Sequence, residues 1–144
     1  MTNKDYDSIK DKTATIRCNE DLMHKFKEVK EIISGGVGKE MSDGATWIVC
    51  LGLALENAID TDLITSDKNV NIKKQIRVNN KALKDLEKLR DLLNEYTEIK
   101  SDVEVWRYSL KLTYRALVID RDIAIRHKNV GDGNNVLWDR RYKG

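Results

Sequence analysis

The sequence is poor in the residues that build metal sites and disulfide frameworks. Its 144 residues include two cysteines, two histidines and no proline. Cys18 and Cys50 form no CxxC motif, and two histidines add too few ligands for a zinc site. We therefore expect two buried free thiols in a reducing cytoplasm, with no metal and no cofactor. The absence of proline by itself excludes no function.

Long apolar runs and a large excess of positive charge are also missing. The longest apolar run, Ala45 to Leu55, is too short to cross a bilayer and ends at Glu56. It is internal rather than N-terminal, so it is no secretory signal and instead predicts a core helix. The 26 Lys and Arg residues face 24 Asp and Glu residues, a formal net charge of +2. Any binding of nucleic acid must therefore come from a local arrangement of side chains.

The glycine-rich stretch SGGVGKEMSDG, residues 34 to 44, lacks essential parts of a phosphate-binding loop. Such a loop needs Gly, four residues and then Gly-Lys followed by Ser or Thr, because the last hydroxyl holds magnesium. Here Ile33 stands at the first glycine position and Glu40 at the hydroxyl position. The apolar spacing before the stretch predicts a helix, so we interpret the glycines as its end. Since no nucleophile–base pair accompanies them, we expect no enzyme.

The chain contains one pattern twice. Residues 16–19 read IRCN, and residues 76–79 read IRVN. Residues 42–53 (SDGATWIVCLGL) and 101–112 (SDVEVWRYSLKL) share Ser-Asp, a tryptophan and two leucines at the same spacing. The apolar positions between these segments match as well, once a single-residue gap is allowed. The sequence therefore contains an internal duplication.

Each copy predicts a strand followed by a helix. Polar and apolar residues alternate at 13–18 and at 73–78, which is typical of half-buried strands. Asn19 and Asn79 follow these strands at the positions expected for helix N-caps. A lone strand leaves its backbone donors and acceptors unpaired. We therefore expect the two strands to pair with each other, because the polar segment 60–72 is long enough to bring them together.

A second helix is predicted near the end of each copy. Ser42 and Ser101 stand at its expected N-caps, and Glu104 completes a capping box with Ser101. The predicted organisation is an N-terminal arm (1–12), a first strand–helix–helix unit (13–59), a linker (60–72), a second unit (73–119) and a C-terminal tail (120–144).

Strand–helix–helix units that pair through their strands resemble the ribbon-helix-helix DNA-binding proteins, the Arc and MetJ superfamily. The resemblance covers residues 13–59 and 73–119. It implies a mainly α fold with a short antiparallel β-ribbon, a tandem ribbon-helix-helix chain that forms an intramolecular pseudo-dimer. In this family two identical chains usually pair, and the ribbon enters the major groove of DNA. Tandem versions occur among conjugation accessory proteins and archaeal virus regulators, which this chain resembles.

Strand alternation defines the residues expected to read DNA bases. The exposed strand positions carry no acidic residue, and Arg, Lys, Gln and Thr are the side chains that reach base edges. An ordinary polar solvent face is the alternative interpretation. The predicted base contacts are Thr13, Thr15, Arg17, Lys73, Gln75 and Arg77.

Backbone phosphates are expected beside this face. The predicted contacts are two flanking lysines and, as the resemblance implies, the starts of the second helices: Lys12, Lys74, Ser42, Gly44, Ser101 and Val103. Asp43 and Asp102 depart from the expected pattern, because a carboxylate near a phosphate weakens binding.

The two copies differ in ways that predict different tasks. Their exposed strand positions are not the same, so we expect an asymmetric rather than a palindromic target. The second helix of the first copy is apolar nearly all round, which predicts full burial or an added contact surface. Its counterpart carries Arg107, Lys111 and Arg115 and is expected to have a solvated face. A hairpin is predicted in the tail, which could add a strand, grip DNA or hold a protein partner.

The predicted function is sequence-specific binding of double-stranded DNA, as a cytoplasmic transcriptional repressor of plasmid or viral type. A conjugation or replication-origin accessory protein would have the same features. An antitoxin whose tail binds a toxin, or a structural nucleoprotein without sequence preference, are further alternatives. Self-association of molecules on adjacent sites is compatible with the fold.

Overall fold

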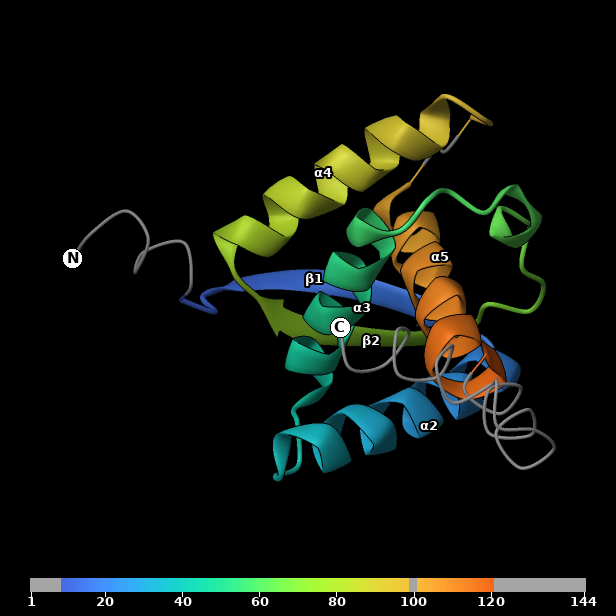
Figure 1. The fold of residues 1–144 in the computed structure, drawn as a ribbon. Coiled ribbons are helices and arrows are strands. Elements are labelled where there is room, and N and C mark those ends of the chain that lie inside the picture. Colours follow the sequence, from blue (N-terminus) through green and yellow to red (C-terminus); the bar gives the residue numbers. More distant parts are fainter. Residues whose placement is uncertain (1–8, 99–100, 121–144) are drawn as a thin grey trace, which may run out of the picture.

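The computed structural model describes residues 9–98 and 101–120 as a mainly helical protein with one two-stranded antiparallel sheet (Figure 1). The elements are β1 (Lys12–Cys18), α2 (Glu20–Val37), α3 (Asp43–Glu56), a 3-10 turn (Thr61–Leu63), β2 (Ile72–Val78), α4 (Asn80–Asn94), α5 (Asp102–Tyr114) and a π-helical extension of α5 (Arg115–Ile119). The order strand, helix, helix occurs twice, as the sequence predicts. Nearly all of the predicted tail, residues 121–144, lies outside the described residues.

The two strands pair with each other along their whole length. Lys12 of β1 lies opposite Val78, and Cys18 lies opposite Ile72, so residue numbers run in opposite directions. Four apolar side chains of the strands, Ile16, Cys18, Ile76 and Val78, are buried, and Ala14 and Ile72 in the same alternation are half-buried. The alternation read from the sequence is therefore confirmed, and it leaves one face of the sheet for the helices and one for solvent.

Asparagine side chains begin the first helix of each unit. The Asn19 side-chain oxygen accepts a hydrogen bond from the backbone N–H of Leu22 at 2.8 Å, and Asn79 accepts from Ala82 at 2.7 Å. Both asparagines cap their helices as predicted. The helix α2 continues to Val37 and ends at Gly38, whose φ of 85° is left-handed. The glycine stretch is thus a helix end, as expected from the sequence.

The second helices begin differently in the two units. The Ser42 hydroxyl accepts a hydrogen bond from the backbone N–H of Ala45 at 3.1 Å and so caps α3. Ser101 occupies the same position before α5, but its side chain makes no capping hydrogen bond. The predicted capping box of Ser101 and Glu104 is therefore wrong in its serine half.

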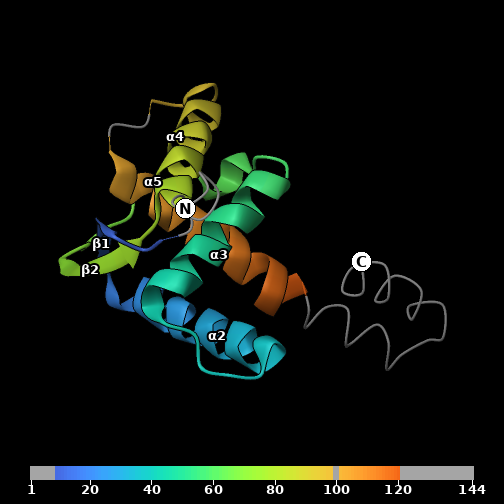
Figure 2. The same ribbon diagram turned by 90° about the vertical axis from the view of Figure 1, so that its left-hand side faces the viewer.

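The two units are interleaved rather than placed side by side. The helix α3 packs on β2, and α5 packs on β1, so each second helix covers the strand of the other unit. The main partner of α2 is α5, and that of α4 is α3. Figures 1 and 2 show α3 and α5 in the middle of the molecule, with α2 and α4 on either side.

Aromatic rings join the two units in the core. The Trp47 ring stacks on Phe26 with centroids 4.7 Å apart and meets the ring of Trp106 edge-on at 6.1 Å. Trp47 and Trp106 occupy the same position in the two copies, and both are buried. One continuous core therefore serves both units.

The helix α5 is the more deeply buried of the two second helices. Its run from Val105 to Leu110 is buried throughout, and Arg107 is only 6% exposed. The expected solvated face of this helix is therefore wrong. The cause is the segment between the units, which lies over α5: the Asp60 N–H donates to the Tyr108 hydroxyl, and Arg115 pairs with Asp60.

Candidate nucleic-acid interface

The outer face of the β1–β2 sheet is the candidate interface. Figure 2 shows both strands at the left edge of the molecule, with most of the helical part to their right. Of the six residues predicted to contact bases, Thr15 is half-buried and the other five are exposed: Thr13, Arg17, Lys73, Gln75 and Arg77. The sheet thus presents all six predicted residues on a face that no described helix covers.

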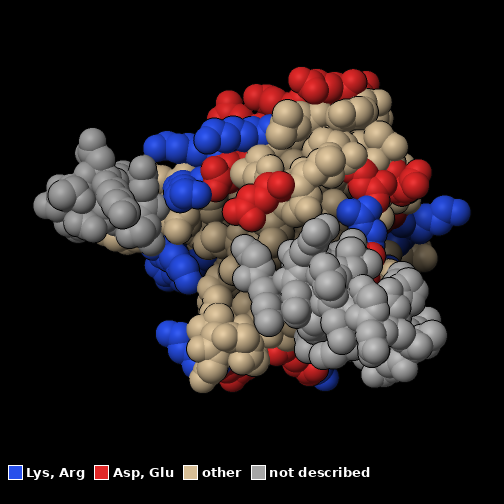
Figure 3. Space-filling view, in the orientation of Figure 1, with Lys and Arg blue, Asp and Glu red and all other residues tan. Residues whose placement is uncertain are grey.

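The strand register arranges these six residues in three cross-strand rows. Thr13 lies opposite Arg77, Thr15 opposite Gln75, and Arg17 opposite Lys73. One end of the face therefore carries two cations across from each other, the centre is neutral, and the other end carries one cation. None of these six residues carries a carboxylate. Figure 3 shows the opposite side of the molecule, where Asp and Glu clusters lie among the Lys and Arg side chains.

The two lysines predicted to flank this face lie on the other side of the strand alternation. Lys12 pairs with Val78, and Lys74 pairs with Ile16, whose side chains point into the core. Lys74 is nevertheless exposed and Lys12 half-buried. Their contact with phosphate stays a prediction, and both positions lie outside the face that carries the six predicted base contacts.

A groove of about 280 Å³ lies between the start of α3 and β2, lined by Lys10, Ser42, Asp43, Gly44, Gln75, Ile76 and Arg77. It lies between residues of β2 that are predicted to contact bases and one predicted phosphate site. Ser42 is exposed, whereas Gly44 is buried. A Cβ atom at Gly44 would lie 2.3 Å from the Arg77 carbonyl oxygen, so only glycine allows α3 to approach β2 this closely. A role of Gly44 toward phosphate stays a prediction.

The corresponding start of α5 contains Ser101 and Val103, both half-buried. Valine here stands where the first unit has Gly44. Val103 therefore has a side chain at the position where Gly44 lets the backbone of α3 contact the backbone of β2. Phosphate contacts by Ser101 and Val103 likewise stay predictions.

Asp43 and Asp102, the two aspartates that depart from the expected phosphate-binding pattern, each form an ion pair. Lys30 Nζ lies 2.9 Å from an Asp43 carboxylate oxygen, and Arg90 Nη1 lies 3.1 Å from one of Asp102. The hydrogen bond to Asp43 is the main reason why the pKa of Lys30 is raised. Lys30 and Arg90 share one repeat position, so aligning the copies could have revealed this pairing. Each pair offsets the negative charge beside a helix start.

The backbone of the two exposed arginines is held by different groups. The Arg107 guanidinium donates from Nη1 to the Arg17 carbonyl at 3.1 Å and from Nε to Asp67 at 2.9 Å. The Arg77 carbonyl instead faces Gly44, and the Arg77 side chain donates from Nε to the Lys10 carbonyl at 3.3 Å. The sequence did not predict that Arg107 contacts Asp67 and the Arg17 carbonyl, because no local pattern links a linker aspartate to a helix forty residues later.

The cysteines take no part in this face. Both are fully buried, and burial raises the pKa of the Cys18 thiol to about 11 and that of Cys50 to about 12. They are therefore protonated and unreactive at neutral pH, as the sequence predicts for core thiols. Across residues 9–98 and 101–120, no cluster of three metal-ligating side chains occurs. Nor does any helix in this part of the chain have the length and apolarity needed to span a membrane.

Comparison with known proteins gives no relative: no family model, no curated protein and no solved structure matches the chain.

Proposed function

We propose that this protein binds double-stranded DNA at a specific sequence by inserting the β1–β2 ribbon into the major groove. The observation that supports this proposal most is the composition of the outer ribbon face. Its six predicted residues are three cations, two threonines and one glutamine, and none of them is acidic. The major groove is about 12 Å wide and admits a two-stranded ribbon. Arg and Lys suit the acceptors of guanine, Gln suits adenine, and Thr suits the methyl group of thymine.

The ribbon is proposed to be the shared centre of a tandem ribbon-helix-helix pseudo-dimer. Thr15 and Gln75 occupy the same position in the two copies and lie opposite each other. Thr13 corresponds to Lys73 but pairs with Arg77, and Arg17 corresponds to Arg77 but pairs with Lys73. A two-fold axis through the Thr15–Gln75 pair would place each of these residues on its counterpart in the other strand. The interleaved helices support the same symmetry.

The proposed DNA site is not a palindrome. A symmetric ribbon would offer the same side chains to both half-sites, whereas this one offers Arg17 and Lys73 at one end and Arg77 with Thr13 at the other. The end with two cations is expected to prefer the guanine-richer half-site. The proposed biological role is transcriptional repression by occupying such a site. A DNA accessory role in conjugation or replication would use the same contacts.

Selection of bound duplexes from a random library at near-physiological salt tests this function. The wild type is expected to enrich a short asymmetric motif, which the variant Arg17→Ala/Arg77→Ala loses. The matched control Lys81→Ala/Lys88→Ala removes two exposed positive charges from α4 and should retain the motif. Because non-specific binding depends on total positive charge, the two variants separate base reading from charge.

Other outcomes of this selection contradict the proposal in distinct ways. Binding without an enriched motif, unchanged in the ribbon variant, would indicate a structural nucleoprotein. No binding at all would exclude the DNA-binding function. A partner that co-purifies with the tail would then favour the antitoxin alternative.

A further inference from the structure

We propose that Arg107 is a positioning residue for base reading, which sets the direction of the Arg17 side chain through the Arg17 carbonyl. This inference rests on the proposed DNA-binding function and concerns one end of the ribbon only. Arg107 lies on α5, away from the reading face, and contacts the strand from behind.

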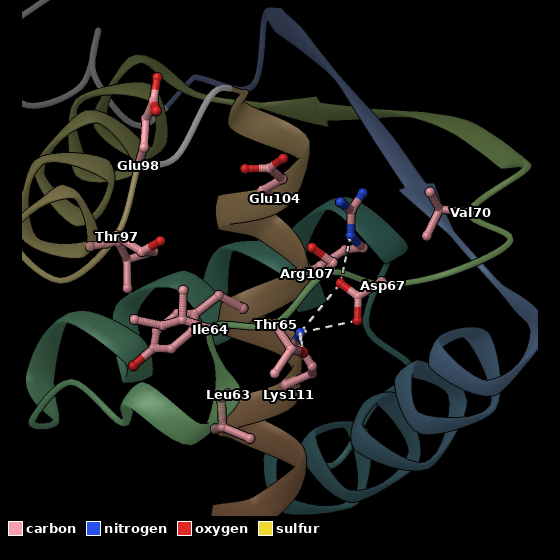
Figure 4. Close-up of a pocket in the computed structure, with 13 residues that line it drawn as sticks. Leu63, Ile64, Thr65, Asp67, Val70, Thr97, Glu98, Glu104, Arg107 and Lys111 are labelled. Atoms are coloured by element: carbon pink, nitrogen blue, oxygen red, sulfur yellow. Dashed lines mark hydrogen bonds and ion pairs between the residues drawn. The ribbon is translucent and has the colours of Figure 1, made fainter.

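The Arg107 guanidinium is held in place by a buried ion triad. Arg107 Nε and Lys111 Nζ lie 2.9 Å and 3.1 Å from the carboxylate of Asp67, and the three side chains are 7%, 11% and 13% exposed. Figure 4 shows Asp67 between the two cations, Arg107 and Lys111. Ion pairs buried to this extent have much of their solvating water removed, so their geometry is fixed by the protein rather than by solvent.

The fixed guanidinium constrains the strand at the residue that reads DNA. Its Nη1 donates to the carbonyl of Arg17, which orients the peptide plane between Arg17 and Cys18. Cys18 on the other side of that plane is fully buried, and the next residue, Asn19, donates from its side chain to the Lys68 carbonyl at 2.9 Å. With the plane and its neighbours held, the Cα–Cβ direction of Arg17 is held as well.

The other end of the ribbon has no such device at the matching position. Ile48 occupies the place of Arg107 in the first unit, and Gly52 that of Lys111. The Arg77 carbonyl is met there by Gly44 of α3. Loss of Arg107 should therefore relax the base preference at the Arg17 end and leave the preference at the Arg77 end intact.

The experiment compares Arg107→Met with the wild type on a panel of duplexes that vary each base pair of the selected motif. Positions are first assigned to Arg17 or Arg77 by the single variants Arg17→Ala and Arg77→Ala. Arg107→Met is expected to reduce discrimination by about tenfold at the Arg17 positions, comparable to losing one good bidentate contact. Discrimination at the Arg77 positions and the salt dependence of binding should not change.

Two further variants keep the test decisive if Arg107→Met folds poorly. The triple variant Asp67→Leu/Arg107→Met/Lys111→Met removes the whole ion triad, which leaves no unpaired charge, and should show the same selective loss. Arg107→Lys supplies one donor group in place of the fork and should restore part of the discrimination. In the free protein, the carbonyl carbon chemical shift of Arg17 should move in Arg107→Met and not in Ile48→Met.

The outcomes separate this inference from the proposed function. If the wild type selects a motif and Arg107→Met loses discrimination equally at all positions, or at none, the role of Arg107 is overturned. DNA reading by the ribbon would still stand in that case. A wild type that selects no motif would overturn both. Loss confined to the Arg17 positions, together with the shift of the Arg17 carbonyl carbon, would establish the role.

Discussion

Two arginines at equivalent positions, Arg17 and Arg77, are held in place by unlike means. The Arg17 carbonyl accepts from the guanidinium of a buried ion triad, whereas the Arg77 carbonyl faces the bare backbone of Gly44. One end of the ribbon is thus fixed by electrostatics and the other by close packing. The two halves share the order strand, helix, helix, and each supports its exposed arginine in its own way.

The difference extends to the whole of the two second helices. The helix α3 is apolar and packs on α5, α4 and β2, whereas α5 carries charged residues that the linker neutralises and covers. Charge in a sequence therefore does not by itself mark a solvated face. A buried cation is stable where a carboxylate from elsewhere in the chain reaches it.

The largest expected effect comes from removing the linker carboxylate. Asp67→Ala leaves Arg107 and Lys111 buried beside each other without a counter-charge, which should lower the free energy of unfolding by about 3 kcal/mol or more. The control Lys81→Ala breaks an exposed pair on α4 and should cost about 0.5 kcal/mol. Urea unfolding followed by circular dichroism measures both. Similar midpoints for the two variants would show that the triad does not hold α5.

The sequence was sufficient for the parts of the fold that depend on neighbouring residues. Alternation at 13–18 and 73–78 identified both strands, each of which begins one residue earlier in the structure, and the positions of Asn19 and Asn79 identified the starts of two helices. These features are local, because a strand or an N-cap needs only a few residues in a row. The six positions of the candidate interface, five of them exposed and Thr15 half-buried, followed from the same alternation.

The parts that could not be predicted depend on contacts between distant segments. The burial of Arg107 requires Asp67 of the linker, and nothing in either local sequence indicates that they meet. The need for glycine at position 44 arises from the crossing of α3 over β2. The missing Ser101 cap depends on which way one hydroxyl turns, which a Ser-x-x-Glu pattern does not determine.

The next effect in size tests the close packing at the other end of the ribbon. A methyl group at position 44 would collide with the Arg77 carbonyl, so Gly44→Ala should lower the free energy of unfolding by about 2 kcal/mol. Gly52 lies in the same helix, and a Cβ atom there meets nothing within 4 Å. Gly52→Ala should therefore raise stability by about 0.5 kcal/mol. Opposite signs in urea unfolding are expected, and a gain in both variants would contradict the steric explanation.

The smallest expected effect compares the two serines at the helix starts. Ser42→Ala removes a capping hydrogen bond and should cost about 1 kcal/mol, whereas Ser101→Ala removes none and should cost only a few tenths of that, about 0.2 kcal/mol. Thermal unfolding of the two single variants under one set of conditions checks this difference. Equal losses would mean that Ser101 caps α5 in solution after all.

The pairing of β1 with β2 inside one chain has a consequence for dilution. A ribbon made of two separate chains falls apart when the protein concentration drops below the dissociation constant of the dimer. Here the strands belong to one chain and are joined through residues 19–71, so the ribbon forms in a unimolecular step at any concentration. Occupancy of a rare binding site would then rise in proportion to the number of molecules, not to its square.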